Sequence, residues 1–147
     1  MAKLTIIRGL PGAGKTTHAK KLIEEMGEYC NTQHYEADLY FNKWPSYTFD
    51  SRLLEAAHDW CYSNVVRALW FGEDCIVSNT FTQMWEMDRY MAIPTIVDNV
   101  QIEVIEMHTR FQNIHGCPED KVSMMAARWE SIPQEWIDDG LKVEIVK

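Results

Sequence analysis

The residues with the clearest chemistry form one continuous stretch close to the N-terminus. Eight of them fit the phosphate-binding pattern G-x-x-x-x-G-K-[ST], and a second threonine follows directly. The stretch reads Gly9, Leu10, Pro11, Gly12, Ala13, Gly14, Lys15, Thr16 and Thr17. Its glycines let the backbone turn tightly with N–H groups pointing inward, where a side chain would block an approaching phosphate. The pattern predicts a binding site for a nucleoside triphosphate.

Two side chains at the end of this loop add chemistry of their own. Lys15 carries a charge that can reach the β- and γ-phosphates, and the Thr16 hydroxyl can bind Mg²⁺. A helix that begins here contributes unpaired amides and the positive end of its dipole. ATP and Mg²⁺ are therefore the expected cofactors, with Thr16 as the metal ligand.

The segments on either side of the loop are those that such a site needs. Leu4-Thr5-Ile6-Ile7 favours a buried strand before it, and apolar residues behind it repeat at helical spacing until Gly27, a typical helix stop. A glycine turn that merely precedes a helix is the alternative. A dinucleotide-binding fingerprint is disfavoured, because the third glycine of G-x-G-x-x-G is missing.

Strand-like and helix-like runs alternate along the rest of the chain. Strands are expected at 32–37, 75–77, 100–105 and 141–145, with helices at 53–69, around 85–90 and after Pro118. This alternation predicts an α/β fold with a parallel sheet of about five strands and helices on both faces. Ligands of such sheets bind beyond the carboxyl ends of the strands.

Polar residues stand just past several of these strands. Asp38, Asn79 and Arg110 follow the second, third and fourth strands, so the sheet should bring them close to the phosphate loop. Asp38 is the best-placed carboxylate, and it could orient or deprotonate an acceptor hydroxyl during phosphoryl transfer. The alternative is that Asp38 only caps the following turn.

A second acidic residue is normally sought at the end of the buried strand 75–77, the Walker B position. Ser78 occupies that place. We therefore expect Mg²⁺ to rest on Thr16, phosphate oxygens and water, with Asp38 at most an outer contact, because magnesium keeps several of its waters.

Residues 110–130 are expected to form a movable lid, because the segment begins with polar residues and contains Gly and Pro. Arg110 and Arg128 flank it. Closing such a lid would exclude water and bring a guanidinium to the transferring phosphate. Solvated surface charges are the alternative for both arginines. Several aromatic residues on the acceptor side could stack a base, although aromatic residues at helical spacing are more often core. They are Trp44, Tyr47, Trp85 and Tyr90.

Composition limits the partners. The 147 residues fit one domain, and a net charge of −8 without a cluster of basic residues argues against a tight grip on long duplex nucleic acid. The four cysteines lack metal-binding spacing, and no apolar run is long enough to cross a membrane. We expect a soluble, cytoplasmic domain spanning residues 1–147, with no membrane partner.

Several separated stretches resemble one known family in the same order along the chain. They are Ile7 to Thr17, Glu36 to Phe41, Ala57 to Trp60, Asn79 to Met87 and Asn113 to Pro118. They resemble the polynucleotide-kinase-like P-loop proteins, which include the kinase-like domain of the NEDD-four-binding proteins and small bacteriophage relatives. This resemblance implies a three-layer kinase-type P-loop NTPase fold with strand order 2-3-1-4-5. It also implies ATP-dependent phosphorylation of a nucleic-acid 5′-hydroxyl.

The resemblance also implies roles for individual residues. Lys15 and Thr16 would hold ATP and Mg²⁺, Asp38 would be the general base, and Asn79 and Thr80 would line the acceptor side. Arg110 and Arg128 match basic positions of the lid. The acceptor side departs from the family, because Leu39, Phe41 and Ser78 replace charged residues. A kinase of a small hydroxylated metabolite or nucleoside, and a nucleotide-binding regulatory module with little turnover, are therefore the alternatives.

Overall fold

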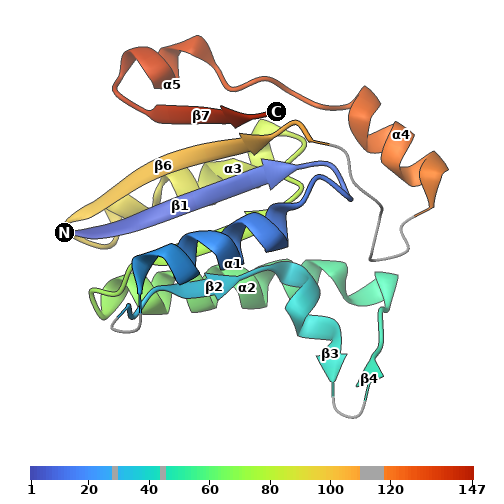
Figure 1. The fold of residues 1–147 in the computed structure, drawn as a ribbon, viewed down its shortest axis with the longest axis horizontal. Coiled ribbons are helices and arrows are strands. Elements are labelled where there is room, and N and C mark those ends of the chain that lie inside the picture. The colour runs from blue at the N-terminus through green and yellow to red at the C-terminus, as the bar shows by residue number, and fades with distance from the viewer. Residues whose placement is uncertain (28–29, 44–45, 110–117) are drawn as a thin grey trace.

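A parallel five-stranded sheet forms the centre of the molecule (Figure 1). The computed structural model describes residues 1–27, 30–43, 46–109 and 118–147. The strands lie in the order β2-β5-β1-β6-β7, and every neighbouring pair is parallel. Their bounds are β1 Ala2–Gly9, β2 Gln33–Tyr35, β5 Cys75–Asn79, β6 Val100–Met107 and β7 Lys142–Val146. The α/β fold and the predicted strand order are both confirmed.

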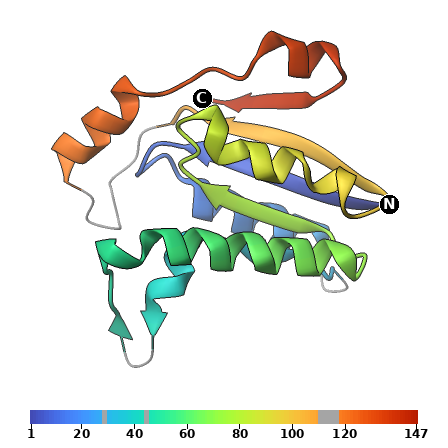
Figure 2. The same cartoon turned by 180° about the vertical axis from the view of Figure 1, so that it is seen from behind.

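Helices cover both faces of this sheet. Helix α1 (Lys15–Met26) lies on one face, in front of the sheet in Figure 1, whereas α2 (Leu54–Trp70) and α3 (Met84–Met91) lie on the other face, in front in Figure 2. Two further helices, α4 (Glu119–Ala127) and α5 (Gln134–Asp138), precede the last strand. The result is the expected three-layer arrangement.

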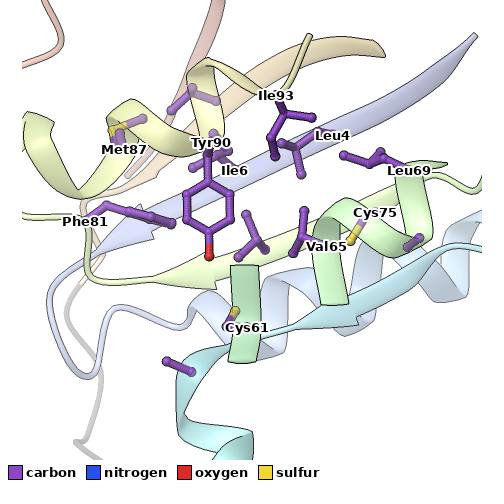
Figure 3. Close-up of a cluster of buried hydrophobic side chains, with 14 of the residues drawn as sticks. Leu4, Ile6, Cys61, Val65, Leu69, Cys75, Phe81, Met87, Tyr90 and Ile93 are labelled. Atoms are coloured by element: carbon purple, nitrogen blue, oxygen red, sulfur yellow. The ribbon is translucent and has the colours of Figure 1, made fainter. Parts of the chain in front are cut away.

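The core follows from the alternation of side chains along the strands. Leu4 and Ile6 of β1 face α2 and α3, where Val65 and Tyr90 belong to the same buried cluster (Figure 3). Ile7 faces the other way, and it packs in a second cluster with residues of β5, β6 and α1. Strand β1 is therefore buried on both faces, which is typical of a central parallel strand. Its fixed position determines where the phosphate loop begins.

The structure departs from the sequence-based expectations in short segments. Strand β2 ends at Tyr35, and Asp38 lies in a 3₁₀ helix, Ala37–Phe41, rather than directly at the strand end. A two-stranded antiparallel hairpin follows, made of β3 (Asn42–Lys43) and β4 (Ser46–Tyr47). This hairpin and α5 were not predicted, because they are too short to show a hydrophobic period.

No helix in the described parts of the chain combines the length and the apolar character needed to cross a membrane.

Candidate nucleotide and acceptor site

The phosphate loop connects β1 to α1 at the carboxyl edge of the sheet (Figure 1). Gly12 and Gly14 have φ angles of 84° and 85°, a left-handed conformation that other residues adopt at a cost. The Ala13 amide donates to the Leu10 carbonyl at 3.1 Å. Gly12 and Gly14 are thus needed for the shape of the loop.

Gly9 is required for a different reason. A Cβ atom at this position would lie 3.0 Å from the Cβ and the carbonyl oxygen of Met107, and 3.1 Å from the Cβ of Ala13. The Gly9 amide also donates to the carbonyl of Thr80 at 3.3 Å. Gly9 lets the start of the loop pack directly against the end of β6, and Thr80 contacts the loop through its backbone.

Lys15 folds back over the loop. Its ammonium donates to the carbonyl oxygens of Gly9 at 2.8 Å and Leu10 at 3.0 Å. Burial lowers the pKa of Lys15 to about 8, and the negative charge of Glu36 partly opposes this shift. The ammonium is therefore already held at the loop, where it can meet an incoming phosphate.

Glu36 is the functional candidate that sequence reasoning missed. Its Oε2 accepts hydrogen bonds from the Thr16 hydroxyl at 2.7 Å and from the Ser78 hydroxyl at 3.0 Å. The residue is largely buried, and it follows the end of β2 directly. The signal was present in the sequence, because the rule that pointed to Asp38 at a strand end applies equally to Glu36.

Ser78 and His34 surround this carboxylate on the other side. Ser78 is 1% exposed at the end of β5, and its Oγ lies 2.7 Å from Nε2 of His34. Burial lowers the pKa of His34 below its ordinary value of 6.5, against the raising effect of Glu36, so the ring is neutral at pH 7. A neutral ring leaves the Glu36 charge uncompensated from that side.

Asp38 and Asn79 lie in adjacent segments, but they have different surroundings. Asn79 is 8% exposed, and its Oδ1 accepts from the Ala37 amide at 2.9 Å. It therefore fixes the start of the 3₁₀ helix that carries Asp38. Asp38 is more accessible, and its Oδ1 accepts from the Tyr47 hydroxyl at 2.5 Å. Burial, followed by the contact with Asp38, raises the pKa of Tyr47 above its ordinary value.

Trp85 and Arg128, two further predicted site residues, lie on other elements of the fold. Trp85 is 68% exposed on the first turn of α3, and Arg128 is exposed directly after α4. Glu130 joins these two regions, since its amide donates to the Thr82 carbonyl at 2.7 Å and its carboxylate accepts from the Met84 amide at 3.1 Å. Arg110 lies outside the described residues, as does the 110–117 part of the expected lid.

The position of this C-terminal segment depends on Arg8, a second residue that sequence reasoning missed. Arg8 is fully buried, and it donates to the carbonyls of Phe81 and Glu130 and to the Glu106 carboxylate at 2.8 Å. Its guanidinium also stacks 3.7 Å from the ring centroid of Trp129.

A pocket of about 360 Å³ lies beside the phosphate loop, at the lower end of the range for small-molecule sites. Its lining residues come from the loop, the end of β6 and the last turn of α4 with the residues after it. They are Leu10, Ala13, Met107, His108, Ala126 and Trp129. A planar apolar ligand such as a nucleobase could be held there next to its phosphates.

Comparison with known proteins agrees with this geometry. A family model described as "AAA domain" matches residues 4–113, about three quarters of the chain. The chain belongs to this family. The human NEDD4-binding protein 2 is 30% identical over 139 residues, which is 86% of this chain but only 8% of that protein. The chain thus spans a small part of this AAA domain relative, and the resemblance inferred from the sequence is confirmed.

Solved structures extend the likeness of this AAA domain to kinase-like folds. Chaetomium thermophilum Kti12 in complex with ADP-AlF3 has a TM-score of 0.68 at 15% identity, covering 97% of this chain and 88% of that one. For the Pnkp1/Rnl/Hen1 RNA repair complex the TM-score is 0.55 at 17% identity, and the match covers 94% of this chain and 42% of that one. For a gluconokinase from Sinorhizobium meliloti the TM-score is 0.56 at 12% identity, and the match covers 98% of this chain and 81% of that one. At these identities the likeness concerns the fold alone.

Proposed function

We propose that this chain is an ATP-dependent phosphotransferase and that its acceptor is the 5′-hydroxyl end of a polynucleotide. One observation carries the proposal: two contacts fasten the Asp38 segment to the phosphate-loop edge. Glu36 accepts from Thr16 at 2.7 Å, and the amide of Ala37 donates to Asn79 at 2.9 Å. A carboxylate suited to act on an acceptor is thereby held at the edge of the sheet where the loop lies.

The nucleotide half of the site consists of the loop and its pocket. The inward-turned loop and the Lys15 ammonium suit the phosphates, and Thr16 is the ligand that the motif provides for Mg²⁺. The base would lie between Leu10 and Trp129, in the apolar pocket described above. The Kti12 structure supports this half, since that protein was solved in complex with ADP-AlF3.

The proposed reaction is a single phosphoryl transfer. The acceptor oxygen attacks the γ-phosphorus, the bond to the β,γ-bridging oxygen breaks, and ADP leaves. The proton of the acceptor hydroxyl passes to the Asp38 carboxylate. When bound, Mg²⁺ would neutralise charge on the phosphates. Asn79 acts here as a positioning residue, because it holds the helix of Asp38 rather than touching the acceptor.

The acceptor half favours a nucleic-acid end on two grounds. The exposed rings of Tyr47 and Phe49 stand beside Asp38, because the Tyr47 hydroxyl bonds to it and both rings pack on Phe41. Such rings can stack a base next to a 5′-hydroxyl. The RNA repair complex with a similar fold is the second ground. The acidic chain suits a short single-stranded end better than a long duplex.

We propose supporting roles for four further residues of the site. Thr80 adjoins the start of the phosphate loop, and Trp85 offers an exposed ring on the first turn of α3. Arg110 and Arg128 would supply positive charge to the transferring phosphate from the lid.

The test follows the γ-phosphate. The protein is incubated with Mg²⁺ and γ-labelled ATP in the presence of 5′-hydroxyl DNA, 5′-hydroxyl RNA, a nucleoside, gluconate or water alone. We expect label on the oligonucleotide ends, and a fall in rate of roughly 10²- to 10⁴-fold in Asp38→Asn. Asp98→Asn is the matched control, because Asp98 is an exposed residue just before β6, at the opposite edge of the sheet.

Each other outcome contradicts the proposal in a defined way. Label on the nucleoside or on gluconate would identify a small-molecule kinase, the activity named for the structurally similar gluconokinase. ATP binding with label only on water, or with no release of label, would identify a nucleotide-binding module. An Asp38→Asn variant as active as Asp98→Asn would remove Asp38 from its role.

A further inference from the structure

The end of β5 lacks the acidic side chain that a phosphate-loop site usually places there. Ser78 stands in this position, opposite Ile7 of β1 in the sheet register, and it is buried. On the far side of β5, strand β2 ends at Tyr35, opposite Val77. Glu36 comes next in the chain, one strand further from the loop than the usual acid.

Glu36 nevertheless reaches back to the helix start. Its Oε2 lies within hydrogen-bonding distance of both the Ser78 hydroxyl (3.0 Å) and the Thr16 hydroxyl (2.7 Å). The Glu36 carboxylate therefore contacts Ser78, which stands where the acidic residue is usually found. It also contacts the Thr16 hydroxyl, near which that acidic residue would normally act. The short Ser78 side chain leaves room for the longer Glu36 side chain. An aspartate at position 78 would instead repel the Glu36 carboxylate.

The two hydrogen bonds determine what the Thr16 oxygen can do. A hydroxyl has one proton and two lone pairs, and Glu36, being acceptor-only when ionised, takes the proton. The lone pairs of the Thr16 oxygen are then left for a cation. Hydroxyl, carboxylate and phosphate oxygens are the hard donors that Mg²⁺ prefers, and magnesium usually keeps several waters besides one or two carboxylates. The residues present fit the ion.

We propose that Glu36, directly after β2, supplies the carboxylate that Ser78 of β5 does not supply, so that Thr16 and Glu36 together hold the Mg²⁺ of bound ATP. This assignment rests on the nucleotide binding proposed above. Among the described residues, including those of this site, no group of three or more His, Cys, Asp or Glu side chains is arranged to hold a metal ion. The cation would therefore depend on the phosphates of the nucleotide, and it should bind with ATP rather than before it.

The experiment measures how far Mg²⁺ tightens ATP binding, without using turnover. Titration calorimetry gives the Kd for ATP in excess EDTA and in excess Mg²⁺, and the ratio of the two is the magnesium enhancement. We expect Glu36→Gln to lose roughly tenfold or more of this enhancement, because it keeps the size of the side chain but not its charge. Its affinity for metal-free ATP should be unchanged or higher. Glu25→Gln, an exposed change near the C-terminal end of α1, should behave like the native chain.

A relocated carboxylate separates the assignment from loss of folding. The double variant Glu36→Ser/Ser78→Asp moves the acid to β5, and it should recover most of the magnesium enhancement that the single variants Glu36→Ser and Glu36→Gln lose. Circular dichroism and thermal melting of each variant confirm that it is folded.

The two proposals can fail separately. If the native chain binds ATP and Glu36→Gln keeps the full enhancement, the assignment of Glu36 is overturned and the proposed phosphotransferase stands. If folded Glu36→Gln and the double variant are equally impaired, Glu36 serves the loop structurally and the assignment is also overturned. If the native chain binds no ATP with or without Mg²⁺, the proposed function falls, and the assignment falls with it.

Discussion

Lys15 and Glu36 bring opposite charges to the phosphate loop and the start of α1. Neither side chain has to be recruited when a ligand arrives, because Lys15 is already bonded to the loop carbonyls and Glu36 to two hydroxyl groups. Side chains held in place lose less conformational freedom on binding than free ones do. The proposed triphosphate site is therefore preorganised at the level of single residues.

One partly buried histidine away from this loop gives a test of the electrostatics. Burial lowers the pKa of His58 below 6.5, with Arg89 acting in the same direction and the carboxylates Glu86 and Asp59 opposing. Below pH 6.5 the unfolded chain binds a proton that the folded chain does not yet bind. This group therefore favours unfolding as the pH falls through 6.5, until the pH reaches the pKa of the folded state.

We predict that the stability of the native chain relative to His58→Gln decreases as the pH falls from 7.5 to 5.5. The slope of this difference cannot exceed about 1.4 kcal/mol per pH unit. Urea unfolding of both proteins over this range measures it, and measurements between pH 7.5 and 8.5, where the difference should be constant, are the control. A difference independent of pH throughout would contradict the lowered pKa of His58 in the folded chain.

At the level of residues, the sequence predicted the candidate residues that are contiguous in the chain. It missed those that only the fold brings together. Gly9 to Thr17 form one motif, so their role could be inferred without a fold. The contact of Glu36 with Thr16 joins positions 20 residues apart, and its contact with Ser78 joins positions 42 apart. Asn79 was expected to line the acceptor side. Its buried side chain instead accepts from the backbone of the Asp38 helix, a contact that only the three-dimensional neighbours reveal.

Among the elements, β1 connects the site to the rest of the fold. It carries the phosphate loop at one end, and its residue Arg8 contacts the β5–α3 loop, strand β6 and the chain after α4. Breaking a buried ion pair by removing one partner is strongly destabilising, because the other charge is left without compensation. Arg8 should therefore matter for the stability of the fold as well as for the position of the segment that follows α4.

We predict that Arg8→Met lowers the free energy of unfolding by about 3–5 kcal/mol, since it leaves the Glu106 carboxylate buried without its guanidinium. The double variant Arg8→Met/Glu106→Met should be less destabilised than the single one, because neither charge remains. Urea unfolding measures both. Arg52→Met, which removes the guanidinium of an exposed ion pair with Asp50, is the control and should change stability little. Equal losses in Arg8→Met and Arg52→Met would contradict the role of Arg8.

The main elements could be predicted because each has a long periodic pattern. The five strands and the helices α1 to α4 lie where hydrophobic spacing and stop residues placed them. The hairpin β3–β4 and helix α5 have two to five residues per element, which is too few for a period of 2 or 3.6 to appear. Their positions depend on tertiary contacts, such as the packing of Tyr47 and Phe49 on Phe41.

At the scale of the whole molecule, the charge and the architecture both agree with binding of a nucleotide at one edge of the sheet. The net charge of −8 disfavours wrapping a long polyanion, whereas the positive groups of the phosphate loop are gathered at one edge of the sheet. The membership in the AAA domain family and the kinase-like structural neighbours agree with an edge that binds a nucleotide. The central claim is that this edge binds ATP through the loop and Lys15.

Calorimetric titration of the purified chain with ATP and Mg²⁺ tests this claim most directly. We predict one site per chain with a Kd on the order of micromolar, accompanied by a rise in Tm. Lys15→Ala should weaken binding by roughly 10- to 100-fold through loss of a charge-assisted bond, whereas Lys21→Ala, an exposed change on the same helix, should not. No heat and no change in Tm with the native chain, or equal affinity in Lys15→Ala, would contradict the claim.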